Sequence, residues 1–317
     1  MTGTRLKVVY IMGRGRSGST IIANLLNELD GFFAVGELHN LWRRGLGKRE
    51  ACACGVPVPE CEVWSKVMES MRAPGDVPPA RVVEWQTEVV RLRNTRKLLR
   101  KSQGRPTGWA ALDAYARQLS SVYGAVAGVT GAAVVVDSSK RPEHGALLHL
   151  VADVDPYFIH LVRDPRAVAY SGRRHRAGLD RELRRYGPVV STFRWDKRNL
   201  ASEAVRGHHQ PNRSLQLRYE DFVTQPHSSL AAIVELLEEP SAKLPFTDDQ
   251  EAELGVNHSL SGNPSRFQTG TVEIRPDEKW RGEQARKDRL ASTAMALPWL
   301  HRYGYPIRPT RSHDGRL

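Results

Sequence analysis

Short apolar runs alternate with segments of helical spacing along most of the chain. The run Lys7–Met12 predicts a buried strand, and Thr20–Leu29 repeats apolar residues at the spacing of a helix. Two further strands are predicted at Ala132–Val136 and Tyr157–Val162. Helical patterns follow these two strands, at Glu143–Val151 and Pro165–Arg176.

The same alternation continues in the rest of the sequence. Strands are predicted at Phe32–Val35 and Ser214–Leu217 and a helix at Ser228–Glu239, while residues 62–129 look mostly helical. Strands that alternate with helices predict an α/β fold, with a parallel β-sheet flanked by helices on both faces. We expect one domain over residues 1–308, with a helical insertion at about 62–130 and a flexible tail at 309–317.

Composition adds little to this picture. The chain has 317 residues, of which 40% are hydrophobic, and no apolar run approaches the roughly 18 residues needed to span a bilayer. Its first apolar stretch is too short for a signal sequence and leads straight into a glycine-rich loop. We therefore expect a cytoplasmic protein without stable membrane insertion.

Charge indicates an anionic partner. The net charge is +12 and arginine far outnumbers lysine, which suits bidentate binding of phosphate or sulfate. Nucleic acid, anionic lipid and a polyanionic small molecule all fit this charge. The segment Arg81–Arg100 is basic and amphipathic, and we interpret it as a solvated helix face rather than a membrane or nucleic-acid surface.

Three cysteines lie within ten residues of one another, at Cys52, Cys54 and Cys61. Three thiols cannot complete a disulfide framework, and a zinc site would need a fourth ligand, for which His39 is only a distant candidate. We expect a small structural cluster or one reversible disulfide here, and no metal.

The loop from Gly13 to Thr20 carries the clearest chemistry. It reads Gly-Arg-Gly-Arg-Ser-Gly-Ser-Thr and joins a strand to a helix N-terminus, an arrangement that binds anions through free backbone N–H groups. As an ATP-binding loop it lacks the lysine, because Ser19 stands in that place. As a dinucleotide loop its glycines fit, and Glu37 lies near the spacing of a ribose-binding acid.

A third interpretation places the cation inside the loop, at Arg16, beside the hydroxyls of Ser17, Ser19 and Thr20. This pattern resembles the 5'-phosphosulfate loop of sulfotransferases that use 3'-phosphoadenosine-5'-phosphosulfate (PAPS). The resemblance implies a P-loop-like sulfotransferase fold and a donor site in this loop. Its donor-binding residues would be Arg14, Gly15, Arg16, Ser17, Gly18, Ser19 and Thr20.

A second segment strengthens the resemblance. The strand Tyr157–Val162 ends in Arg163, Asp164 is placed to cap the next helix, and Ser171 lies two turns into it. The sulfotransferase family has a similar arginine and serine, eight positions apart after a strand, that hold the donor's 3'-phosphate.

Two later segments are also similar to the family. Leu217–Phe222 resembles a motif whose tyrosine lies near the adenine, which would be Tyr219. Residues 258–267 resemble the loop that closes over the nucleotide in bacterial members, where Arg266 would contact a phosphate. The Cys-x-Cys-Gly segment also looks like this bacterial branch. The resemblance covers roughly residues 7–40, 133–176 and 214–282.

The resemblance also implies catalytic residues. Gly36-Glu37 matches a Gly-Glu of tyrosylprotein-type members, which makes Glu37 the first candidate base, and His39 is the second. Many cytosolic members use a histidine after a central strand, but here that strand ends Asp137-Ser-Ser-Lys140. This leaves Lys140 as a sulfate-contacting cation, Ser138 or Ser139 as hydrogen-bond donors near the substrate, and Arg16 to stabilise the leaving oxygen without a metal.

We therefore expect a PAPS-dependent sulfotransferase that acts on a hydroxyl of a small molecule, carbohydrate or lipid and releases 3'-phosphoadenosine-5'-phosphate (PAP). The helical insertion would shape its acceptor pocket, and we expect no nucleic-acid partner. The alternatives are a nucleic-acid or anionic-membrane binding protein on a degenerate nucleotide fold, and an NAD(P)-dependent enzyme. Acceptor class and oligomeric state stay open.

Overall fold

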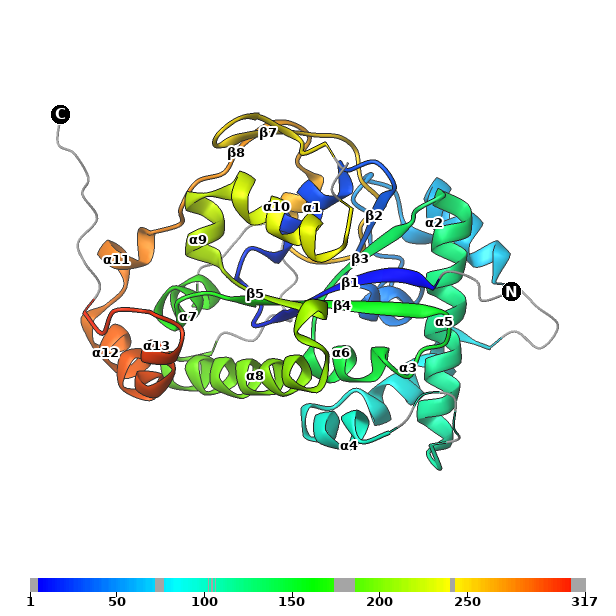
Figure 1. The fold of residues 1–317 in the computed structure, drawn as a ribbon, viewed down its shortest axis with the longest axis horizontal. Helices are drawn as coiled ribbons and strands as arrows, with labels where there is room; N and C mark the ends of the chain where they lie inside the picture. The colour runs from blue at the N-terminus through cyan, green and yellow to red at the C-terminus, as the bar shows by residue number, and fades with distance from the viewer. Residues whose placement is uncertain are drawn as a thin grey trace.

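A five-stranded parallel sheet forms the centre of the molecule (Figure 1). The structure is a computed structural model that describes residues 5–71, 77–101, 103, 105, 107–173, 186–239 and 243–308. Its strand order is β2-β3-β1-β4-β5. The strands are β1 (Leu6–Gly13), β2 (Phe32–Gly36), β3 (Val134–Lys140), β4 (Val154–Val162) and β5 (Ser214–Arg218).

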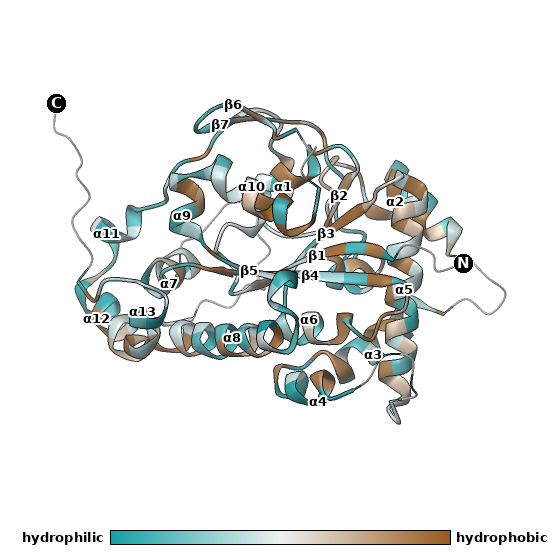
Figure 2. Cartoon of the chain, viewed as in Figure 1, coloured by the Kyte–Doolittle hydropathy of each residue, from teal (hydrophilic) through white to brown (hydrophobic). Residues whose placement is uncertain are grey.

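Both faces of this sheet are buried, which explains the continuous apolar runs of the sequence. In β1, Val8 and Tyr10 belong to a core cluster on one face, while Val9 and Ile11 belong to a second cluster on the other. All four side chains are fully buried. Figure 2 shows the hydrophobic residues concentrated along β1 and β3, where the two clusters meet the sheet. The predicted α/β fold with a parallel sheet is confirmed.

Helices cover the two faces separately, as Figure 1 shows. One face carries α1 (Ser19–Asn27), α9 (Tyr219–Thr224) and α10 (Pro226–Leu236). The other carries α6 (Pro142–Leu148), α7 (Pro165–Arg173) and α8 (Pro188–His208), against which α11 (Lys279–Glu283), α12 (Arg286–Met295) and α13 (Leu297–Arg302) lie. The long helix α8 was not predicted. The predicted continuation of α7 to Arg176, like the predicted tail, lies outside the described residues.

The described residues of the stretch 62–130 are mostly helical, as predicted, and form α2 (Glu62–Ser70), α3 (Pro79–Val89), α4 (Thr95–Leu99) and α5 (Ala110–Thr130). The prediction of one continuous helix over Arg81–Arg100 is wrong. The chain leaves helical geometry at Val90 and is extended at Arg91, because Val89 and Val90 are buried in the core. The side-chain amide of Asn94 then donates to the carbonyls of Glu88 and Val89, at 3.1 and 2.9 Å. A continuous basic helix face is therefore absent from this segment.

A small antiparallel sheet was missed by the sequence analysis. It consists of β6 (Phe246–Asp248), β7 (Glu251–Leu254) and β8 (Gly270–Glu273), in that order. Ala252 and Leu254 bury their side chains in the same cluster as α1 and α10. The segment between β7 and β8 returns to the main sheet, where Leu260 bridges to Gly36. Strands of three or four residues with few apolar positions give too weak a pattern to predict.

Six short helical turns complete the described structure. They are Leu38–Asn40, Leu41–Leu46, Val58–Glu60, Leu92–Asn94, Pro211–Arg213 and Pro264–Phe267. Among the helices of the described ranges, none is long and apolar enough to cross a bilayer.

Candidate active site

The carboxyl ends of all five parallel strands open onto one cleft. The Gly13–Thr20 loop follows the central strand β1, with Glu37 and Lys140 at the ends of β2 and β3 on one side of it. Arg163 and Tyr219 follow β4 and β5 on the other side. Residues from each of these five strand ends line a cleft of about 1460 Å³. The strand order thus divides the cleft into a Glu37–Lys140 side and an Arg163–Tyr219 side, with the loop between them.

Close approach of other groups explains two glycines of the loop. At Gly13 φ is 138°, and a Cβ there would lie 2.3 Å from the Leu161 carbonyl oxygen. At Gly18 φ is 89°, and a Cβ would lie 2.7 Å from the ring of Tyr219. Only glycine fits either position. Arg16 adopts a φ of 74° although it has a side chain, a conformation that is uncommon outside functional or strained turns.

The loop presents donors to the cleft from both backbone and side chains. Helix α1 begins at Ser19, and because Gly18 precedes it no side chain caps its first N–H groups. Of the predicted donor-binding residues in the loop, the following line the cleft: Arg14, Gly15, Arg16, Gly18, Ser19 and Thr20. Ser17 does not line the cleft, since it is buried and its hydroxyl donates to the Arg14 carbonyl at 2.7 Å. Ser17 therefore stabilises the conformation of the loop instead of facing the cleft.

Arg163 joins the loop to the far side of the cleft. Its Nη1 donates to the Arg16 carbonyl at 3.0 Å, and its Nη2 donates to the Asp277 carbonyl at 2.9 Å. Its guanidinium carbon lies 4.2 Å from the ring centroid of Tyr219, a cation–π contact. Ser171 lines the same cleft from α7, so the arginine and serine that are eight positions apart in sequence face one space.

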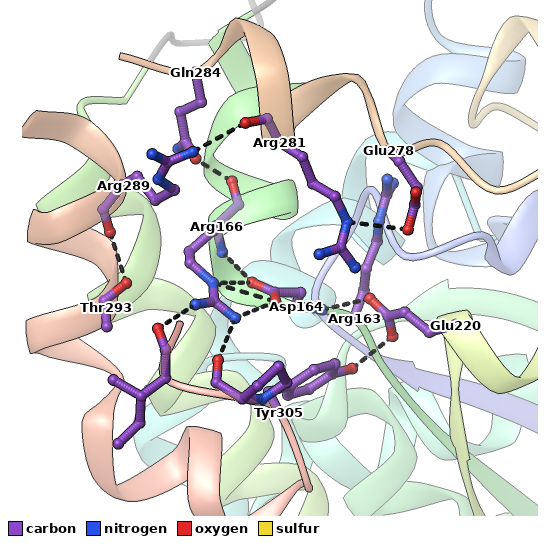
Figure 3. Close-up of polar contacts among 12 residues, drawn as sticks. Arg163, Asp164, Arg166, Glu220, Glu278, Arg281, Gln284, Arg289, Thr293 and Tyr305 are labelled. Atoms are coloured by element: carbon purple, nitrogen blue, oxygen red, sulfur yellow. Dashed lines mark hydrogen bonds and ion pairs between the residues drawn. The ribbon is translucent and has the colours of Figure 1, made fainter. Parts of the chain in front are cut away.

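An ion pair outside the cleft fixes the turn that carries Arg163 (Figure 3). Asp164 Oδ1 accepts from the backbone N–H of Arg166 at 2.8 Å, which caps α7 as the sequence predicts. The Arg166 guanidinium is fully buried, donates to Asp164 Oδ2 at 2.6 Å and also donates to the carbonyls of Pro306 and Ile307. The sequence analysis missed Arg166, although its position two residues after Asp164 is visible in the sequence.

The same turn is also held by Glu220 of α9, the helix that follows β5. The backbone N–H of Asp164 donates to Glu220 Oε1 at 3.0 Å, and the hydroxyl of Tyr305 donates to Glu220 Oε2 at 2.8 Å. Figure 3 shows Glu220 and Tyr305 beside the Asp164–Arg166 pair. Burial raises the pKa of Glu220, and the backbone of Asp164 opposes that shift. Both polar networks place Arg163 without touching the cleft themselves.

On the other side of the cleft, Glu37 and Lys140 form an ion pair. Lys140 Nζ lies 2.6 Å from Glu37 Oε1, and the side-chain amide of Asn40 donates to Oε2 at 2.9 Å. A Cβ at Gly262 would lie 3.4 Å from Glu37 Oε1 and 3.7 Å from the Thr20 hydroxyl oxygen. Gly262 therefore packs against both Glu37 and Thr20, and both residues line the cleft.

The other substrate-side candidates do not line the cleft. His39 is partly buried and does not line the cleft, and its backbone N–H donates to the Ser139 hydroxyl at 3.2 Å. Burial, and then the nearby Arg141, hold the pKa of His39 well below its ordinary value. Ser138 and Ser139 are buried. Of the two candidate bases, the structure brings Glu37 into the cleft and leaves His39 behind it.

The cleft is rich in arginine, and Arg163 and Arg266 are buried within it. Burial lowers the pKa of Arg14 to about 10, with a further contribution from repulsion by Arg198 and Arg194. Within the described part of the chain, the Nε atoms of Arg14, Arg163 and Arg266 are buried without an acceptor. Arg266 lines the cleft, as predicted from sequence, and donates weakly to the carbonyls of Gly262 and Ala51, each at 3.3 Å. This cation-rich cleft fits a ligand with several negative charges.

Sequence reasoning missed four further cations that line the cleft, namely Arg43, Arg44, Arg194 and Lys279. They come from three segments that are distant in sequence, so no local motif identifies them.

Comparison with known proteins identifies the family and a similar fold. The model of the sulfotransferase family matches residues 9–243. Among solved structures, the chain is similar to a sulfotransferase domain from the curacin biosynthetic pathway, with 19% identity, a TM-score of 0.55, and coverage of 96% of this chain and 99% of that one. A sulfotransferase domain from the Synechococcus PCC 7002 olefin synthase gives 18% identity, a TM-score of 0.48, and coverage of 96% and 97%. No curated protein sequence matches the chain.

Proposed function

The chain belongs to the sulfotransferase family, and from that premise we propose that it transfers a sulfuryl group from PAPS to a hydroxyl acceptor. One observation carries the proposal. The strand order places the anion-binding loop between a carboxylate–ammonium pair and an arginine–tyrosine pair. A nucleotide donor with charge at its 5' and 3' positions needs cations on both sides of one loop, with a base near only one of them.

The donor fits the charges that line the cleft. In this proposal the loop N–H groups, Ser19 and Thr20 hold the 5'-phosphosulfate at the start of α1. Arg163 and Ser171 hold the 3'-phosphate, and Tyr219 lies at the adenine. The buried Nε atoms of Arg14, Arg163 and Arg266, which have no acceptor among the described residues, support a polyanionic ligand over an uncharged one.

The chemistry follows from the position of Glu37. The acceptor oxygen forms a bond to sulfur while the bond between sulfur and the 5'-phosphate oxygen breaks, and PAP leaves. Glu37 takes the proton of the acceptor hydroxyl, and Lys140, 2.6 Å from it, positions the carboxylate and supplies a cation beside the transferred group. Arg16 and the loop N–H groups stabilise the charge that develops on the leaving phosphate.

The acceptor is a small-molecule, carbohydrate or lipid hydroxyl that enters on the Glu37 side of the cleft. Arg43 and Arg44 line this part of the protein, on the turn Leu41–Leu46 that follows Glu37. The helical stretch 62–130 packs against the same turn through α3. We propose that these segments select the acceptor.

Binding of PAP tests the proposal directly. PAP is expected to raise the unfolding temperature in a dose-dependent way, since a ligand at 100 times its Kd adds about 2.7 kcal/mol of stability. NADPH and a DNA duplex, the latter at low and high salt, are tested as alternative ligands in the same assay. Stabilisation by NADPH or DNA together with none by PAP at any concentration would refute the donor assignment. Incubation with PAPS and a panel of phenols, sugars and lipid alcohols, with PAP release as readout, then identifies the acceptor class.

A further inference from the structure

Three cysteines and a histidine meet behind the cleft. The Sγ atoms of Cys52, Cys54 and Cys61 and a ring nitrogen of His258 all lie within 4.8 Å of one another. The three thiols are free. The sequence analysis found no fourth ligand near the cysteines and considered only His39; that argument against a metal is wrong, because the fold brings His258 to them across 197 residues.

The distances within this cluster match a tetrahedral metal site. With Zn–S bonds of about 2.3 Å and a Zn–N bond of about 2.0 Å, tetrahedral ligands lie about 3.8 Å apart for two sulfurs and about 3.5 Å for sulfur and nitrogen. Here Cys54 Sγ and Cys61 Sγ are 3.7 Å apart, and Cys61 Sγ and His258 Nδ1 are 3.2 Å apart. We propose that Cys52, Cys54, Cys61 and His258 bind one structural Zn²⁺ ion.

The local backbone structure around the cysteines brings their sulfur atoms close together. The turn after Cys52 closes through a bond from the Gly55 N–H to the Cys52 carbonyl at 2.9 Å, with a φ of 94° at Gly55. Cys61 immediately precedes α2, at the helix end where the backbone dipoles favour a thiolate. In the segment that follows β7, the His258 carbonyl accepts from Trp64 Nε1 at 2.6 Å, which fixes the histidine backbone. A site in which the protein supplies all four ligands is characteristic of structural zinc, because a catalytic zinc keeps one coordination position open.

A disulfide or a catalytic thiol accounts for fewer of the four residues in this cluster. A disulfide between Cys54 and Cys61 would have to bring sulfurs from 3.7 Å to the bonded distance of about 2.05 Å, and it would leave Cys52 and His258 without a role. A catalytic thiol is disfavoured because Cys52 and Cys61 are fully buried and none of the four residues lines the cleft.

The site would tie two distant segments together beneath the cleft. The N–H of Ala53 donates to the Ser259 carbonyl at 3.1 Å, and Cys52 bridges to Leu260. Leu260 in turn accepts from the N–H of Glu37 at 2.7 Å and donates to the Val35 carbonyl at 2.9 Å. A metal at this point therefore holds the loop that carries Arg266 and supports the backbone of Glu37.

The metal content of the full chain tests this inference. Protein purified without chelator from zinc-supplemented cells is expected to contain about one Zn²⁺ per chain by elemental analysis, and Cys61→Ser and His258→Ala to lower that content to near zero. His227→Ala, a change at an exposed histidine away from the cluster, serves as the matched control and should keep the full content. Zinc retained by both cluster variants, or wild-type protein with little zinc after reconstitution, would overturn the proposal.

Two measurements on the wild-type chain cover the case in which the variants fail to fold. Replacement of zinc by Co²⁺ should give the thiolate charge-transfer and intense visible bands of a tetrahedral sulfur-rich site. Removal of metal with a chelator should lower the unfolding temperature, and added Zn²⁺ should restore it. A weak octahedral-type Co²⁺ spectrum, or stability unchanged by chelation, would contradict the site. Both readouts are independent of PAP, so they separate this inference from the proposed function.

Discussion

Lys140 and Glu37 come from adjacent strand ends 103 residues apart, and their side chains form an ion pair with 2.6 Å between Nζ and Oε1. Each is only 16–17% exposed, and both line the cleft. Because Asn40 holds the second carboxylate oxygen, Glu37 has little rotational freedom. If Glu37 is the base, as proposed, it meets the acceptor in one orientation, which is the requirement for efficient proton transfer.

Glu37→Gln is expected to lower kcat by about 10²–10⁴-fold and to leave the Kd for PAP nearly unchanged, because the amide keeps the shape and loses the basic oxygen. Steady-state kinetics and calorimetric titration with PAP measure the two effects. Glu50→Gln is the matched control, since Glu50 is a second carboxylate of the cleft and pairs with Arg44. Retained turnover in Glu37→Gln removes it as the base.

Arg163→Ala is expected to weaken PAP binding by about 2 kcal/mol or more, which corresponds to roughly 30-fold in Kd, because a charge-assisted contact to phosphate is lost. Isothermal titration with PAP gives the value. Arg173→Ala, on the same helix as Ser171 but half exposed and paired with Asp288, should bind PAP as the wild type does. An equal loss of PAP affinity in both variants would indicate a general effect of positive charge instead of a contact made by Arg163.

Gly18→Ala is expected to abolish donor binding, since the new methyl group would lie 2.7 Å from the Tyr219 ring in a backbone conformation that alanine avoids. Gly128→Ala is the control, because this exposed glycine of α5 does not line the cleft and a Cβ there would meet no neighbouring group within 4 Å. PAP-induced shifts in unfolding temperature distinguish the two variants. Donor binding retained by Gly18→Ala would show that the described loop geometry is incorrect.

Arg166→Met is expected to destabilise the fold by about 3–5 kcal/mol, because it leaves the Asp164 carboxylate buried and unpaired. Chemical denaturation measures this loss, and the double change Asp164→Asn with Arg166→Met should recover part of it. Arg281→Ala removes a surface pair with Glu278 and should cost under about 1 kcal/mol. A loss of stability below about 1 kcal/mol in Arg166→Met would show that the buried pair does not stabilise the turn.

Acidification is expected to destabilise the protein through buried histidines. Burial lowers the pKa of His160 to about 4, so the folded state keeps it neutral while the unfolded state takes up a proton below pH 6.5. Stability is therefore complete above pH 6.5 and falls toward pH 4, with a loss of roughly 2 kcal/mol at pH 5 from this group. Denaturation at several pH values measures the slope, and His160→Gln should reduce it. An unchanged slope in that variant would exclude His160 as a contributor.

The sequence by itself determined the features that contiguous residues create. The apolar run before Gly13, the loop and the helical stripe after it predict an anion site, because every donor in it belongs to one short segment. The cap at Asp164 and the facing of Arg163 and Ser171 follow in the same way from spacing along a strand and a helix. The alternation of strands and helices was enough to predict the parallel sheet.

Only the tertiary structure decided which distant residues meet. Strand order placed Lys140 against Glu37 and Tyr219 against Gly18, and the return of the chain after β7 brought His258 to the three cysteines. Burial of Val89 and Val90 broke the helix that the basic pattern predicted. The physical reason is common to all of these. Periodicity records how a segment faces the core, but contacts across long separations depend on the order in which strands pair and on the path of the chain between them.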